Sequence, residues 1–548
     1  MLHGSRCFRC FKPAEVGIGA FLGQHVGFRA EVQRFAFDFL VREQHHDGPA
    51  RLSQECEVSD FVNFAKACDE NCENSHVWFT LVKREHTTPE ALNKIARALQ
   101  LPAQTKAFSF CGMKDRWGIT TQRGSFPTDA LKDLRPVVFK DPNIKVGDLE
   151  WKASKARVGS HQGNCFTMVL RDVQSGTGGA QQTRQDIAES FQSLKATGFP
   201  NYFGMQRFGT GQRPSSEMGL SLLRQDHKEA VLVVLRSRAR HGAALQAFLR
   251  AKEGCFNEAL KMIPRSCLQE HAVPKLRHGE KAHESVLQHL AEDPDDFRGA
   301  LKAIPRHLRL LWCRSLGSHI WNRVLSLRIQ EGMMEPLAGD FIMDESGVRC
   351  LRPGEQNDTP LSDILLPVPG FECQRPQNDC ADIYQRVLNE MRIDEEVFQK
   401  PEAEDEIWMA GNFRPAIGQP SQLGFHFIDH APPSPLVPND LEDGCHVDGS
   451  SQHDPLALVV DFCLPKSSYA TMAVRELMKM DPLAKTGRAG GRGEIARLTA
   501  MTGNISSSAS GHFRTLSSTA ALRPTYCSTD TTQPRWRTLV ALPDGQTE

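Results

Sequence analysis

The sequence predicts an α+β fold in which helices and strands surround one mixed sheet. Residues 76–85, with the sequence HVWFTLVKRE, form an apolar run of strand length. Residues 166–173 alternate apolar and polar side chains, as expected for a half-buried strand. Between them, Thr88-Pro89 opens a helix, with Thr88 as N-cap and the proline in the first turn. The apolar face of this helix comprises Leu92, Ile95, Ala96 and Leu99.

A charged turn follows the next expected strand. Residues 107–111 are largely apolar and predict a short buried strand, which Gly112 ends. The turn then presents Lys114, Asp115 and Arg116. Flanking cations favour the ionised form of a carboxylate, and an ionised, positioned aspartate acts as a nucleophile or a base. Taken alone, the same triplet is also typical of solvated surface.

An aromatic segment lies further along the chain. Residues 201–209, NYFGMQRFG, combine three aromatic rings, two amides, an arginine and two glycines. Aromatic faces stack on bases, and amides and arginine bind polar base edges, which is the chemistry that holds an extruded nucleobase. A buried aromatic turn explains the same composition. A linker-like segment at 175–179 and a polar helix lead into this motif.

Residues 212–455 differ in character from the segments before them. Helices are expected at 229–235 and 308–329, and a flexible loop rich in Pro, Asp, Gly and Ser is expected at 431–455. An apolar strand is expected at 456–464.

Five segments, taken in order, resemble the TruD family of pseudouridine synthases. They are residues 38–43 (DFLVRE), 112–122 (GMKDRWGITTQ), 163–171 (GNCFTMVLR), 201–209 (NYFGMQRFG) and 462–476 (FCLPKSSYATMAVRE). Of these five, the segments around Asp115 and Asn201 are specific for the family. The resemblance implies a pseudouridine synthase catalytic domain with a mixed sheet, interrupted by a large family-specific (TRUD) insertion domain.

The resemblance also implies domain boundaries. They are a partly disordered N-terminal extension at 1–30, the first part of the catalytic domain at 31–211, the insertion domain at 212–455, a returning strand and helix at 456–483, and a C-terminal tail at 484–548. The tail is rich in Gly, Ser and Thr, which predicts disorder.

The activity implied by the family is the isomerisation of uridine to pseudouridine in structured RNA, with a uridine of the tRNA D-arm as the expected target. The product is an isomer of the substrate, so we expect no cofactor and no metal. Asp115 is the expected catalytic carboxylate, acting either on the sugar as a nucleophile or as a base.

The resemblance assigns the other site residues to substrate binding. Phe203 is expected to stack on the target base, and Asn201 to hydrogen-bond to the base or the sugar. Lys114 or Arg116 is expected to hold a phosphate or to orient Asp115. Gln206, Arg207 and Tyr469 complete the expected set. Tyr469 equally fits a buried tyrosine that bridges two segments.

The chain departs from the family pattern at three places. Trp117-Gly118 stands where the family has a small or basic residue and then alanine. Residues 315–318 (SLGS) lack an aromatic residue and an amide of the family, which puts the usual RNA contacts of the insertion in doubt. Ser467 replaces a glycine.

The composition is that of a large globular protein. The 548 residues are 40% hydrophobic and 24% charged. No run of eighteen apolar residues exists, so no membrane span is expected. The net charge of −1 means that RNA must be held by local patches. Arg306, Arg309 and Arg314 share one broad helical face and are candidate RNA contacts, although solvated helices show the same pattern. No obligate protein partner is evident, and we expect a monomer.

The sixteen cysteines are scattered, and no signal peptide is evident. We therefore expect free thiols in a reducing intracellular compartment, the nucleus or the cytoplasm. The first fourteen residues contain Arg and Lys but are too few to support organellar targeting. Cys7 and Cys10, with Cys68 and Cys72, have the spacing of two half zinc sites, but no ligand motif surrounds them and free thiols are preferred.

Two other function classes fit parts of the sequence. A catalytically inactive RNA-binding or chaperone protein with the same fold is favoured by the altered residues 315–318 and opposed by the intact Asp115. A glycosidase or nucleosidase that acts on free nucleosides requires a second carboxylic acid. Glu43 could supply it, but the large insertion would then have no purpose.

Overall fold

The structure is a computed structural model of the chain. It describes residues 11–482 apart from 68–74, 102–107, 133, 136–137, 176–178, 210–212, 237–281, 283–284, 287, 291, 294, 401–406 and 442–454. The expected disordered tail and the four cysteines considered for zinc lie outside the described residues.

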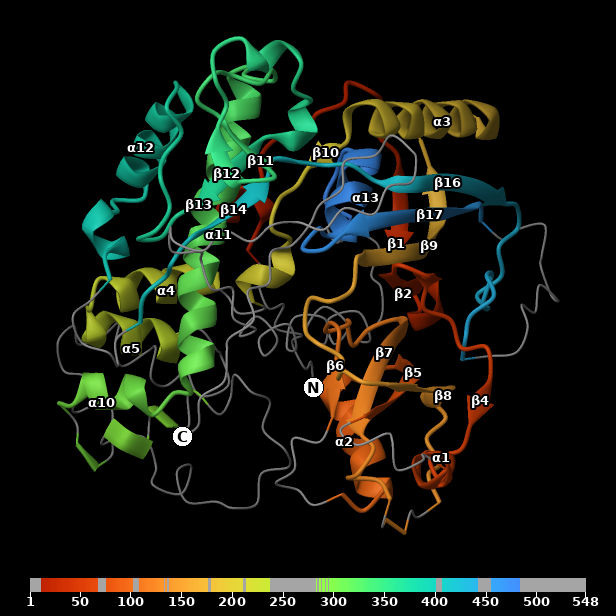
Figure 1. Cartoon of the computed structure of the whole chain (residues 1–548). Coiled ribbons are helices and arrows are strands. Elements are labelled where there is room, and N and C mark those ends of the chain that lie inside the picture. The colour runs from red at the N-terminus through yellow and green to blue at the C-terminus, as the bar shows by residue number, and fades with distance from the viewer. Residues whose placement is uncertain are drawn as a thin grey trace, which may run out of the picture.

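An eleven-stranded mixed sheet occupies the right half of the molecule in Figure 1 and confirms the predicted fold class. Its main strands, in spatial order, are β16 (Ser421–Ile428), β17 (Ala457–Pro465), β9 (Gly163–Gln174), β2 (Phe39–His45), β7 (Ile119–Pro127), β5 (His76–Arg84), β8 (Ile144–Lys152) and β4 (Glu55–Cys56). The short strands β1 (Arg29–Val32), β3 (Gly48–Pro49) and β6 (Ser109–Phe110) pair with β9, β2 and β7. Strands β2 and β7 are parallel, and the other described pairs of this sheet are antiparallel.

Helices cover one face of this sheet. Helices α1 (Asp60–Lys66) and α2 (Thr88–Ala98) form a core with Phe79 of β5 and Phe126 of β7. At the other end of the sheet, α3 (Ala180–Thr197) and α13 (Ala470–Met478) form a core with residues of β9 and β17 (Figure 1). The loop that carries Asp115 joins β6 to β7 beside α2.

The N-cap of α2 is Thr87, one residue before the predicted Thr88. The Thr87 hydroxyl accepts a hydrogen bond from the Glu90 N–H at 3.1 Å, and the Glu90 carboxylate accepts one from the Thr87 N–H at 2.9 Å. This reciprocal pair is a capping box. The sequence offers two adjacent threonines, and the position of Glu90 three residues after Thr87 selects the first.

The second half of the molecule lies to the left in Figure 1 and is mostly helical. It contains α4 (Ser215–Leu223), α5 (His227–Arg236), α10 (Phe297–Lys302), α11 (Arg306–Gln330) and α12 (Cys380–Glu390). Its four-stranded sheet has the order β12 (Gly347–Cys350), β11 (Phe341–Asp344), β13 (Leu365–Val368) and β14 (Asn412–Pro415). Helices α5 and α11 confirm the two helices expected in this region. Strand β15 (Ile417–Gly418) pairs with β10 (Phe199–Pro200), beside the NYFG motif.

Residues 421–428 form a strand of the large sheet, although the sequence placed them in the insertion. This strand, β16, pairs with β17 at the edge of the sheet. Residues 431–441 form no helix or strand, as expected for a loop, but Leu436 and Val437 are buried against the face opposite the helices. Asp440 in this segment pairs with Arg42 of β2 at 3.2 Å. Pro-rich composition indicates turns, and it does not show whether a segment is buried.

The described part of the predicted N-terminal extension is also packed. Val16 and Ile18 are buried in the main core. Ser326 of α11 donates a hydrogen bond to the Gly17 carbonyl at 2.5 Å and accepts one from the Gly19 N–H at 2.9 Å. These residues therefore join the two halves of the molecule.

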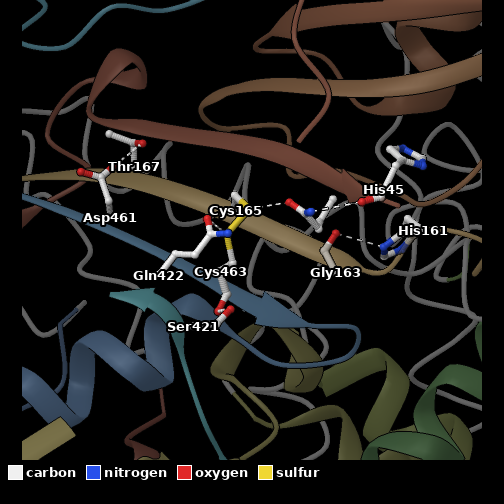
Figure 2. Close-up of a disulfide and its surroundings, with 10 residues drawn as sticks. His45, His161, Gly163, Cys165, Thr167, Ser421, Gln422, Asp461 and Cys463 are labelled. Carbon is white, nitrogen blue, oxygen red and sulfur yellow. Dashed lines mark hydrogen bonds between the residues drawn. A yellow bond between two sulfur atoms is a disulfide. The ribbon is translucent and has the colours of Figure 1, made fainter. Parts of the chain in front are cut away.

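A disulfide joins two neighbouring strands of the large sheet. Cys165 of β9 and Cys463 of β17 lie opposite each other in the antiparallel register and are bonded, as Figure 2 shows. On the next pair of the same face, Thr167 donates a hydrogen bond to Asp461 at 2.6 Å. The expectation of free thiols is corrected for these two cysteines. They are 298 residues apart, so only the strand register brings them together.

None of the described helices combines the length and the apolarity needed to cross a bilayer.

Candidate active site

The loop that carries Asp115 is fixed by hydrogen bonds between polar groups of its own motif and α2. Gln122 of β7 donates from Nε2 to the Gly112 carbonyl at 2.9 Å. Thr88 donates from Oγ1 to Gln122 Oε1 at 2.8 Å and accepts from the Lys114 N–H at 3.1 Å. The two ends of the motif are therefore tied to the first turn of α2.

Lys83 of β5 is hydrogen-bonded to the backbone of the loop. It is fully buried, and its Nζ donates to the backbone carbonyls of Asp115 at 2.8 Å and His86 at 2.9 Å. Burial lowers the pKa of Lys83 to about 7, although the nearby charge of Asp115 opposes this change. Lys83 was not selected from the sequence, because Lys83, Arg84 and Glu85 together look like the ordinary charged end of a strand.

Asp115 itself is half-buried at the end of the loop. Burial raises its pKa, while the cations of Lys83 and Lys114 act in the opposite direction. Within the described residues, no donor forms a hydrogen bond to its carboxylate. A partly desolvated carboxylate that is not engaged by donors retains its nucleophilicity and basicity.

Lys114 forms a buried ion pair and does not face solvent. Its Nζ lies 2.7 Å from Glu43 Oε1 of β2. The other Glu43 oxygen accepts a hydrogen bond from the Arg123 N–H at 3.1 Å and lies 2.9 Å from His45 Nε2. Burial alone would raise the pKa of Glu43, but Lys114 and neighbouring histidines lower it to about 2. Glu43 is therefore ionised at neutral pH and cannot be the acid that a nucleosidase requires.

Glycine is required at position 118, where the family has alanine. Gly118 has φ +125°, and a Cβ there would lie 2.6 Å from the Phe39 carbonyl oxygen. The neighbouring backbone of β2 thus explains the first departure from the family pattern.

The NYFG motif is organised by Arg414 of β14. Arg414 donates from Nε to the Asn201 carbonyl at 2.8 Å and from Nη2 to Asn201 Oδ1 at 2.9 Å. Its guanidinium carbon lies 4.2 Å from the centroid of the Phe203 ring. Trp321 of α11 meets the same ring edge-on at 5.5 Å. Asn322 binds the Phe203 backbone on both sides, at 2.8 Å to its N–H and 3.0 Å to its carbonyl.

Asn201 is buried, and its amide is already engaged. Its Nδ2 donates to the Pro415 carbonyl at 3.1 Å, in addition to the Arg414 contact with Oδ1. In this structure Asn201 orders the motif and does not present a free amide to a base. Arg414 was not selected from the sequence, because it lies in the insertion, far from the motifs, within a short run (GNFR) without periodicity.

The returning segment after β17 contacts the Asp115 loop. Lys466 donates from Nζ to the Gly159 carbonyl at 2.8 Å. The Gly159 N–H donates to the Cys111 carbonyl at 2.7 Å, directly before Gly112.

The same segment contacts the NYFG motif. Arg414 donates from Nη1 to the Ser467 carbonyl at 2.8 Å. Ser467 has φ +67°, the left-handed conformation that favours the glycine of the family. A Cβ at Gly204 would lie 2.8 Å from Tyr469 Cδ1, so the tyrosine ring packs on the NYFG turn. The segment after β17 is thus hydrogen-bonded both to Gly159, which bonds to the start of the Asp115 loop, and to Arg414, which holds the NYFG motif.

The remaining expected substrate-binding residues lie around this centre. Arg116 donates to the Glu85 carbonyl at 3.0 Å and lies 3.5 Å from the Glu90 carboxylate, half-exposed to solvent. Arg207 donates to Ser318 Oγ of α11 at 3.3 Å. Gln206 has a buried Oε1 without a hydrogen-bond partner among the described residues.

The three arginines expected to contact RNA do not share an exposed face. Arg306 is exposed and Arg314 is half-buried. Arg309 is only 9% exposed, and its Nε donates to the Ile304 carbonyl at 3.1 Å. The helical spacing was predicted correctly, but the Arg309 side chain bonds to the turn that precedes α11.

One cluster of metal-binding residue types lies near the site. Glu43, His45 and Cys111 place ligand atoms within 4.8 Å of one another. Glu43 is already paired with Lys114, and burial raises the pKa of the Cys111 thiol to about 11. A cation here would have to displace an ammonium and deprotonate this thiol, so the donor set does not fit a metal.

Comparisons with known proteins place the chain among pseudouridine synthases. A family model described as tRNA pseudouridine synthase D (TruD) matches residues 15–477. Pseudouridylate synthase 7 homolog from Mus musculus is 28% identical over 419 residues, which cover 75% of this chain and 60% of that protein. Multisubstrate pseudouridine synthase 7 from Schizosaccharomyces pombe is 29% identical over 442 residues, which cover 73% of this chain and 62% of that protein. The chain thus spans less than two thirds of the length of both relatives.

A solved structure shows the same fold. It is a candidate tRNA pseudouridine synthase D (TruD) from Methanosarcina mazei, with a TM-score of 0.61 and 21% sequence identity. The similarity covers 86% of this chain and 98% of that chain.

Proposed function

We propose that this protein converts uridine to pseudouridine in structured RNA, because the chain belongs to the tRNA pseudouridine synthase D (TruD) family. The conversion breaks the bond between N1 of uracil and C1′ of ribose and forms a bond between C5 and C1′. The C5 proton leaves to solvent and N1 takes up a proton. Atoms balance without an oxidant, a reductant or a nucleotide.

Asp115 is the carboxylate of this reaction in our proposal. The supporting observation is its setting: a half-buried carboxylate that no described donor engages, on a loop held by Lys83 and tied to α2. Two buried cations counter the effect of burial on its pKa and favour the ionised form that either role needs.

Phe203 supplies the stacking face for the extracted uracil. An aromatic face tolerates in-plane rotation of the detached base, which must turn before C5 can bond to C1′. Tyr469 packs against the same turn and forms the neighbouring wall.

The substrate class is a tRNA, with other structured RNAs as further targets. The matching family is named for tRNA, and the relative from Schizosaccharomyces pombe is named as a multisubstrate enzyme. A uridine of the D-arm is the first position to test.

The test uses the full chain with tRNA transcripts that carry tritium at C5 of uridine. Each turnover releases one tritium to water, and chemical mapping of pseudouridine then locates the modified position. The Asp115→Asn variant is nearly isosteric and should bind RNA with unchanged affinity, with a release rate at least ~1,000-fold lower because an amide is neither nucleophile nor base. RNA binding without tritium release by the unmodified protein would favour an inactive RNA-binding protein. Release at the normal rate by the asparagine variant would exclude Asp115.

A further inference from the structure

We propose that Arg414 is a positioning residue of this site, which sets the orientation of Phe203 and of the Asn201 backbone for the target nucleotide. The proposal deepens the proposed function and rests on it. Arg414 comes from the same half of the molecule as Trp321 and Asn322 of α11, which also contact Phe203.

The first observation is a buried cation without an opposite charge. Arg414 is 5% exposed, and among the described residues its hydrogen-bond acceptors are all uncharged oxygens. Two other buried arginines are paired with carboxylates, since Arg171 lies 2.7 Å from Asp38 and Arg328 lies 2.6 Å from Asp340. Burial of a charge without such a partner costs stability.

The second observation is that all three nitrogens of the guanidinium donate hydrogen bonds. Nε and Nη2 bind the carbonyl and the side-chain oxygen of Asn201, and Nη1 binds the Ser467 carbonyl. Nη2 also reaches the Tyr202 carbonyl at 3.4 Å. The planar guanidinium presents its donors in one fixed geometry, which the rotatable donors of a lysine ammonium do not reproduce.

The third observation is the flat face of the same group. The guanidinium carbon lies 4.2 Å from the Phe203 centroid and 5.8 Å from the Tyr469 centroid. At 4.2 Å it covers one side of the Phe203 ring, so that side is not open to a base, and the Arg207 guanidinium carbon lies 5.8 Å from the same centroid. Burial lowers the pKa of Arg414 to about 10, and the group is still a cation at neutral pH. Arg414 therefore fixes the plane on which the uracil would stack and closes one of its sides to the base.

The test measures single-turnover tritium release with enzyme in excess over RNA. The variants are Arg414→Lys, which keeps the charge but not the planar guanidinium, and Arg414→Met, which keeps neither. Single-turnover rate constants of both variants should fall about ten- to a hundredfold, as expected for a misplaced binding surface, while RNA affinity changes less than threefold. Arg328→Lys is the matched control, because it alters a buried arginine of the same half that lies against Asp340. A single-turnover rate constant does not depend on the fraction of folded enzyme, so lower stability alone leaves it unchanged.

A second measurement is independent of activity. A 4-fluorophenylalanine placed at position 203 should give one narrow ¹⁹F resonance, which shifts and broadens in both Arg414 variants and not in Arg328→Lys. Normal rate constants in the Arg414 variants, or an equal loss in the control, would overturn the proposal. If the unmodified protein converts no uridine, the proposed function fails, and the ¹⁹F spectra then decide the positioning role alone: an unchanged resonance in Arg414→Met rejects it.

Discussion

The ammonium of Lys83 lies 2.8 Å from the backbone carbonyl oxygen of Asp115, at the centre of the candidate site. One buried side chain thereby fixes the position of the loop and supplies positive charge close to the carboxylate. The same lysine has a pKa lowered to about 7 by burial, so its charge is itself sensitive to pH near neutrality.

Replacing Lys83 should shift the acid limb of the activity profile. Burial raises the pKa of Asp115 and Lys83 lowers it, so Lys83→Met should raise that pKa further. Since the reaction needs the ionised carboxylate, the rate should begin to fall at a higher pH than in the unmodified protein. Single-turnover rates from pH 5 to 8 measure the shift. Lys152→Met, at the end of β8, serves as the control, and an acid limb that does not move in Lys83→Met would contradict the assignment.

Phe203→Ala should slow turnover by about ten- to a hundredfold, because base–aromatic stacking contributes roughly 1–3 kcal/mol per base. Phe203→Tyr and Phe203→Trp should retain more activity than the alanine variant. Phe203 is also packed against Trp321, so thermal unfolding must be measured on the same samples. A lower melting temperature with a normal single-turnover rate would show that Phe203 is only a core residue.

Glu43→Gln should destabilise the protein in a pH-dependent manner. Glu43 has a pKa of about 2 in the folded protein, below its usual 4.5, so its contribution to the free energy of unfolding is complete above pH 4.5. That contribution, about 3 kcal/mol, is lost as the pH falls from 4.5 to 2. Urea unfolding at pH 7 and at pH 3 should show a large difference between variant and unmodified protein at pH 7 and a smaller one at pH 3. A difference of equal size at both values would rule out the Glu43–Lys114 pair as its source.

Metal chelation should leave activity unchanged. The cluster of Glu43, His45 and Cys111 is occupied by Lys114 and contains a protonated thiol, and the isomerisation needs no Lewis acid. Tritium release after dialysis against EDTA should match that of the untreated protein. Loss of release that added zinc restores would revive the cysteines at 7, 10, 68 and 72 as ligands.

The sequence predicted the secondary structure close to the motifs well, because local patterns decide it. The β5 strand and the α2 helix differ from prediction by a residue at most, since an apolar run and a proline in the first turn are local signals. The burial of segment 431–441 was not predicted, because it depends on the sheet face that the segment covers.

Part of the candidate site was predicted, because those residues lie in local sequence motifs. Asp115, Asn201, Phe203 and Tyr469 lie in motifs and were selected. Lys83 and Arg414 act through backbone carbonyls, which carry no sequence signature. Lys114 was expected to hold a phosphate or to orient Asp115, and its buried partner Glu43 could be found only from the parallel pairing of β2 and β7.

The pairing of β9 with β17 has a consequence for synthesis on the ribosome. Cys165 and Cys463, which mark the two strands, are separated by 298 residues. At a translation rate of about 5–20 residues per second, the edge of β9 waits roughly 15–60 s for its partner strand. During that interval a long unpaired edge is open to other chains, which is the usual start of aggregation. Expression at low temperature, or with chaperones that bind exposed strands, should therefore raise the yield of soluble protein.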